Sequence, residues 1–68
     1  MTFTAISRHE DFGSFATEIN APTVRAAKAR AGKIQRSNGH GWRISLLAEG
    51  GEGAIARRDA GAKKWVNE

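Results

Sequence analysis

The segment TVRAAKARAGKIQR, residues 23–36, holds the residues of this chain best suited to binding an acidic group. Its five basic residues, with no acidic residue among them, are Arg25, Lys28, Arg30, Lys33 and Arg36. Guanidinium and ammonium groups donate charge-assisted hydrogen bonds to carboxylates, phosphates and carbonyl oxygens, and these bonds are stronger than neutral ones. The segment therefore predicts recognition of an acidic or oxygen-rich partner.

Residues suited to catalysis are few elsewhere in the chain. The two histidines are His9, in the stretch RHED, and His40, between two glycines, and there is no cysteine. Neither histidine has a serine or a second histidine at a spacing typical of a triad or a metal site. We expect both histidines to lie in exposed turns, and we expect a protein that is not an enzyme and that uses no metal or cofactor.

Charge is distributed unevenly along the 68 residues. The formal net charge is +4, yet residues 21–48 carry six basic residues and no acidic one. This asymmetry favours nucleic acid or a negatively charged protein surface as the partner, because a merely solvated surface usually mixes both signs. The length predicts one domain over residues 1–68, and the lack of a long apolar run predicts a cytoplasmic protein without membrane contact.

An antiparallel sheet is the scaffold expected to position the basic segment. β-branched and aromatic residues predict a strand over residues 2–8, and period-two alternation predicts a second strand over residues 14–20. Three more strands are predicted at 42–48, 54–58 and 63–67, with a glycine-rich loop at 49–53. The order ββαβββ predicts an α+β fold in which one helix covers one face of the sheet.

The basic segment itself is predicted to be that helix. It is expected to start near Pro22, capped by Asn20 or Thr23, and to end where Asn38 or Gly39 adopts a positive φ. At about 100° per residue, one stripe of apolar side chains faces the sheet and the basic side chains lie opposite or on the flanks. The apolar stripe consists of Val24, Ala27, Ala31 and Ile34. A glycine within the helix, at position 32, costs about 1 kcal/mol relative to alanine, so the last turn is expected to fray.

The same segment resembles a known family. The pattern AK..A.K.Q...G...RI runs from Ala27 to Ile44 without a gap, and Lys64-Trp65-Val66 follows near the end. Together they look like a small phage anti-CRISPR family that is similar in length and element order. Its members bind the guide-RNA surveillance complex of type I-F CRISPR systems. The resemblance covers roughly residues 18–68.

The resemblance implies that the basic helix and the loop after it bind backbone subunits of the complex, where target DNA must hybridise with the guide. Lys28, Lys33 and Gln35 fall on matching helix positions, whereas Arg30 has no basic counterpart in register. The expected partner-binding residues are Arg25, Lys28, Arg30, Lys33, Gln35 and Arg36. The loop at 49–53 departs from the family because it is longer.

Three functional hypotheses are consistent with these residues. The first is a non-enzymatic phage inhibitor, expected to be monomeric, that binds a type I surveillance complex in the host cytoplasm and blocks target-DNA hybridisation. The second is a small basic nucleic-acid-binding phage protein, with Trp42 and Trp65 as stacking surfaces. Both tryptophans alternate with polar residues, however, which favours the core. The third is a subunit of a larger assembly that uses the uncovered sheet face.

Overall fold

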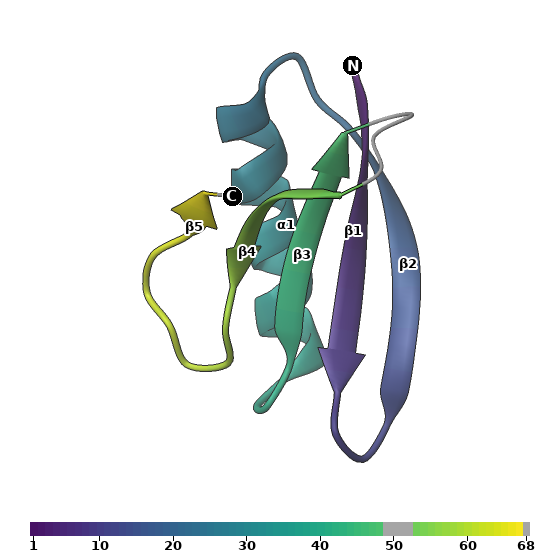
Figure 1. Cartoon of the computed structure of the whole chain (residues 1–68), viewed down its shortest axis with the longest axis vertical. Coiled ribbons are helices and arrows are strands. Elements are labelled where there is room, and N and C mark those ends of the chain that lie inside the picture. Colours follow the sequence, from purple (N-terminus) through teal and green to yellow (C-terminus); the bar gives the residue numbers. More distant parts are fainter. Residues whose placement is uncertain (49–52, 68) are drawn as a thin grey trace.

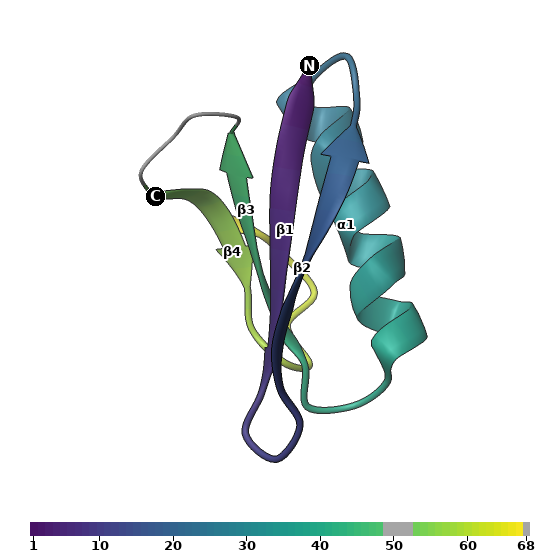
Figure 2. The ribbon, with the colours of Figure 1, turned by 90° about the vertical axis from the view of Figure 1, so that its right-hand side faces the viewer.

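One helix covers one face of a five-stranded antiparallel sheet in the computed structural model, which describes residues 1–48 and 53–67 (Figures 1 and 2). The order ββαβββ confirms the predicted α+β fold. The elements are β1 (Thr2–His9), β2 (Gly13–Asn20), α1 (Val24–Asn38), β3 (Arg43–Ala48), β4 (Ala54–Arg58) and β5 (Val66–Asn67). The predicted loop at 49–53 lies outside the described residues except for its last glycine.

The first strand lies inside the sheet, between β2 and β3. The spatial order is β2-β1-β3-β4-β5, and every neighbouring pair is antiparallel. β1 pairs with β2 from Thr2↔Asn20 to His9↔Gly13 without a register shift, so the two strands form a hairpin. Alternate residues of a strand point to opposite faces. Phe3, Ala5 and Ser7 are accordingly buried on the helix side, and the residues between them lie on the uncovered face.

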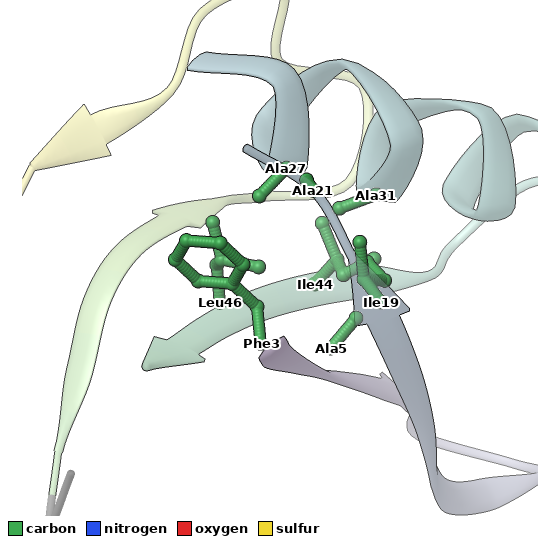
Figure 3. Close-up of a cluster of buried hydrophobic side chains, with 8 residues drawn as sticks. All are labelled: Phe3, Ala5, Ile19, Ala21, Ala27, Ala31, Ile44 and Leu46. Carbon is green, nitrogen blue, oxygen red and sulfur yellow. The ribbon is translucent and has the colours of Figure 1, made fainter. Parts of the chain in front are cut away.

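Small side chains on the helix allow it to lie close to the sheet (Figure 3). Ala27 and Ala31 are fully buried and contact a cluster supplied mainly by the strands. The cluster consists of Phe3, Ala5, Ile19, Ala21, Ala27, Ala31, Ile44 and Leu46. Val24 was predicted to face the sheet but is 40% exposed, whereas Ala21 is 3% exposed and fills the core beside the helix start. Ile34 is half-buried against the cluster, as its place on the stripe predicts.

Side-chain contacts fix both ends of the helix. Thr23 is the N-cap, because its Oγ1 accepts a hydrogen bond from the Ala26 amide at 3.1 Å. The helix ends at Gly39, whose φ is 101°. The last turn, expected to fray, is helical through Asn38, and the Asn38 side chain donates to Ser7 Oγ at 3.3 Å. This bond ties the end of the helix to β1.

The C-terminal segment forms less strand than the sequence predicts. Only Val66 and Asn67 pair with β4, whereas a strand was predicted over residues 63–67. Trp65 is half-buried and packs against the core cluster. The segment therefore closes the β4 side of the sheet beside the helix, mainly through its tryptophan.

Candidate partner-binding surface

Four basic side chains share the solvent-facing side of α1. Arg25, Arg30, Lys33 and Arg36 are all exposed, whereas Ala27, Ala31, Gly32 and Gln35 are buried. We call these four side chains the basic helix surface. The helix contains no acidic residue, so no carboxylate lies one turn away to neutralise them.

The basic helix surface is unengaged within the described chain. Among residues 1–48 and 53–67, none of its four side chains forms a hydrogen bond or an ion pair. The fold therefore does not use these groups for its own stability, since helix contacts with the sheet come from the opposite side. A partner that binds them forms charge-assisted hydrogen bonds without breaking a hydrogen bond within the described chain.

Lys28 belongs to the edge of this surface. It is half-buried, and its Nζ donates to Asn67 Oδ1 at 2.6 Å. The bond joins the first half of the helix to β5. Of the predicted binding residues, Lys28 is thus one that also holds the C-terminal segment in place.

Gln35 lies in the interior, in contrast to its expected role as a surface contact. Its side chain is 7% exposed, and the side-chain amide group forms hydrogen bonds within the fold. Its Nε2 donates to the carbonyl oxygens of Trp42 at 2.8 Å, Arg58 at 3.3 Å and Asp59 at 3.4 Å. Its Oε1 accepts from Arg58 Nε at 2.5 Å. The side chain joins the helix to β4 and to the residue before β3, so it is not placed to contact a partner.

Arg58 completes this buried polar connection. Its guanidinium lies over the Trp65 ring, 5.5 Å from the centroid, and Nη2 donates to the Gly32 carbonyl oxygen at 3.4 Å. A Cβ at position 32 would lie 3.2 Å from Arg58 Nη2. Gly32 therefore admits the guanidinium to the helix backbone, which gives this glycine a packing role. The tryptophan of the KWV ending is likewise a packing residue.

Replacing Gln35 with leucine tests this connection. The substitution keeps the size of the side chain but leaves Arg58 Nε and the strand-end carbonyls without their partner. We expect the free energy of unfolding to fall by about 2 kcal/mol, the usual cost of losing a bond to a charged group. Urea denaturation followed by circular dichroism measures the change. Replacing the exposed neighbour Ser37 with alanine is the control and should change stability by less than about 0.5 kcal/mol.

A cluster of aromatic rings lies at the β1–β2 hairpin and was not expected from the sequence. The His9 ring centroid is 4.6 Å from that of Phe12 and 5.2 Å from that of Trp42. Trp42 also stacks on Phe12 at 6.4 Å and meets the edge of Phe15 at 5.3 Å. The signal in the sequence was the spacing of His9, Phe12 and Phe15 around the turn. Trp42 joins them only through the tertiary fold.

His9 is consequently a packing residue rather than an exposed turn histidine. It is the last residue of β1, it is half-buried, and its Nδ1 accepts a hydrogen bond from the Asp11 amide at 3.0 Å. His40 is exposed in the loop after the helix, as predicted. The two histidines are therefore placed differently, and His9 contributes its ring to the hairpin cluster.

Gly41 lies next to the ring of His9, and its replacement by alanine is expected to be costly. Its φ is 84°, and a Cβ there would lie 2.7 Å from His9 Nε2. Strain and collision together are expected to lower the unfolding free energy by about 2 kcal/mol. Thermal denaturation measures the loss. Gly53→Ala is the matched control with no expected loss, because no atom lies within 4 Å of its added Cβ.

No metal-binding arrangement is present in the described residues, where no three His, Cys, Asp or Glu side chains gather. In the same part of the chain, no helix has the length and apolar character needed to cross a membrane. The most prominent chemical feature of the molecule is thus the basic helix surface.

Comparison with known proteins adds no relative: no family model, no curated protein and no solved structure matches this chain.

Proposed function

We propose that this protein is a non-enzymatic inhibitor that binds a type I CRISPR surveillance complex through the basic helix surface and blocks target-DNA hybridisation. The observation that carries the proposal is the set of four exposed cations on α1, which the described fold leaves unengaged. The resemblance of residues 27–44 to a phage anti-CRISPR family supports the choice of partner.

Fewer residues are placed to contact a partner than the sequence predicts. Arg25, Arg30, Lys33 and Arg36 are free to extend toward a partner, and Lys28 borders them. Gln35 acts indirectly, because its buried amide holds the helix that carries the four cations against Trp42 and Arg58. In this proposal the long cationic side chains reach carboxylates and backbone carbonyls that line a nucleic-acid channel, where charge-assisted hydrogen bonds are strong.

Co-elution with a purified complex tests the proposal. The full chain is mixed with guide-loaded type I-F complex and with other type I complexes, and each mixture is passed over a size-exclusion column. We expect the protein to co-elute with at least one type I complex at physiological salt. Failure to co-elute with any of them would contradict the proposal.

Direct nucleic-acid binding is the second candidate function. The same four cations favour it, because phosphates, like carboxylates, accept hydrogen bonds from arginine and lysine. If all four neutralise phosphates, the logarithm of affinity for duplex DNA should fall with the logarithm of salt concentration at a slope of roughly −3 to −4. Fluorescence anisotropy of the isolated protein with labelled DNA measures this slope. Absence of binding at low salt would exclude this candidate.

A further inference from the structure

On the sheet face that the helix leaves uncovered, two arginines lie directly opposite each other. Arg8 of β1 pairs with Arg43 of β3 in the antiparallel register, and both side chains are exposed. The residues next to them, Ser7 and Ile44, are buried on the helix side. Because neighbouring residues of a strand point to opposite faces, both arginines lie on the uncovered face.

Two like charges in this position disfavour the fold. Residues directly opposite on antiparallel strands have Cβ atoms about 4.5–5.5 Å apart, and like charges there are destabilising. Within residues 1–48 and 53–67, neither arginine side chain forms a hydrogen bond or an ion pair. An anion bound between the two guanidinium groups would change this repulsion into a shared attraction.

A small cavity of about 140 Å³ opens beside the pair. Its lining residues are Arg8, Arg43, Ile44, Ser45, Arg57 and Asp59. Three arginines face one carboxylate there, so the lining carries net positive charge. Arg57 already has an interaction within the chain, whereas Arg8 and Arg43 have none among the described residues. On the other side of the pair, His9 and Glu10 line a second cavity with the same two arginines.

We propose that Arg8 and Arg43 bind a phosphate group on the uncovered sheet face. A tetrahedral oxyanion presents oxygens to both guanidinium groups at once, and each planar guanidinium binds phosphate through two parallel hydrogen bonds. The cavity is of the size of a single small anion rather than of an extended ligand. The site lies across the sheet from the basic helix surface, so it stands apart from the proposed function.

Titration with inorganic phosphate tests the site. Arginine Nε–H resonances and the thermal midpoint of the full chain are followed as phosphate replaces chloride at constant ionic strength. We expect saturable shifts and a midpoint that rises with phosphate, because a ligand that binds the folded state stabilises it. Arg8→Gln/Arg43→Gln should weaken phosphate binding about tenfold or more, because the loss of one hydrogen bond to a charged group lowers affinity by about that factor. Lys63→Gln/Lys64→Gln has the same net charge and should bind phosphate like the wild type, because both lysines are exposed and neither lines the cavity.

A second measurement separates binding from structure. Without phosphate, the Arg8→Gln/Arg43→Gln variant should be at least as stable as the wild type, because the repulsion between the arginines is removed. The proposal would be overturned by resonance shifts that do not saturate, or by phosphate binding that is weakened equally in both double variants. It would also be overturned if, without phosphate, the Arg8→Gln/Arg43→Gln variant were less stable than the wild type. A short single-stranded oligonucleotide then identifies the source of the phosphate. Weaker oligonucleotide binding in the Arg8/Arg43 variant assigns the site to phosphodiesters, and unchanged binding assigns it to free phosphate or phosphomonoesters.

Discussion

Replacing Phe3 with alanine is expected to unfold most of the protein at 25 °C. Phe3 is 1% exposed and is among the largest fully buried side chains of the described chain (Figure 3). Truncating a buried phenylalanine costs about 3–5 kcal/mol, because contacts are lost and a cavity remains. The whole stability of a single hydrophobic core in a domain this small is seldom more than about 3–5 kcal/mol. The helix alanines are too small to fill the space.

Phe12→Ala is the matched control for this prediction. Phe12 lies in the β1–β2 hairpin turn and is 75% exposed, so its loss should lower the unfolding free energy by about 1 kcal/mol or less. Circular dichroism of the two variants across a urea titration measures both effects. A Phe3→Ala protein that stays folded with a midpoint close to that of Phe12→Ala would show that the cluster is not the main source of stability.

Reversing two charges on the basic helix surface is expected to lower affinity for the surveillance complex by about 100-fold or more. Arg30→Glu/Lys33→Glu removes two cations and, in the complex that we propose, places two carboxylates opposite acceptor groups of the partner. Each lost bond to a charged group costs about 1.5–3 kcal/mol, and 1.4 kcal/mol is a tenfold change in affinity. The fold should keep its stability, because both side chains are exposed and unengaged within the described chain.

The control for this change reverses two charges on the opposite face. Arg8→Glu/Arg43→Glu alters the net charge by the same amount on the uncovered side of the sheet. Surface plasmon resonance with immobilised complex compares the two double variants. Affinity that falls only in the helix variant supports a localised contact. An equal fall in both would indicate that only the overall charge attracts the protein.

Local patterns were sufficient to predict most of the fold. Period-two alternation predicted a strand over residues 14–20, and β2 is observed at Gly13–Asn20. Helical spacing placed Ala27 and Ala31 in the core and the arginines outside. The predicted length of the final strand, residues 63–67, is too great, since only Val66 and Asn67 form a strand. Trp65 is held by its contacts with the core and Arg58 rather than by backbone hydrogen bonds between strands.

The sequence predicted only part of the candidate site, because contacts between residues far apart in the chain leave no local pattern. Arg25, Arg30, Lys33 and Arg36 are exposed, as a helical wheel predicts. The burial of a polar glutamine in the same helix depends on carbonyl groups from β4 and from the residue before β3. No periodicity encodes such partners, which lie up to 24 positions away in the chain. The aromatic cluster shows the same limit, since Trp42 reaches the hairpin only after the chain has passed through the helix.

Target-DNA binding by the surveillance complex tests the central claim most directly. A guide-loaded type I-F complex is incubated with saturating wild-type protein or with the Arg30→Glu/Lys33→Glu variant, and labelled target duplex is then added. We expect wild-type protein to abolish guide–target hybrid formation, measured by permanganate footprinting of the displaced strand, and the variant to leave it intact. Hybrid formation that proceeds normally with the wild-type protein bound to the complex would contradict the account.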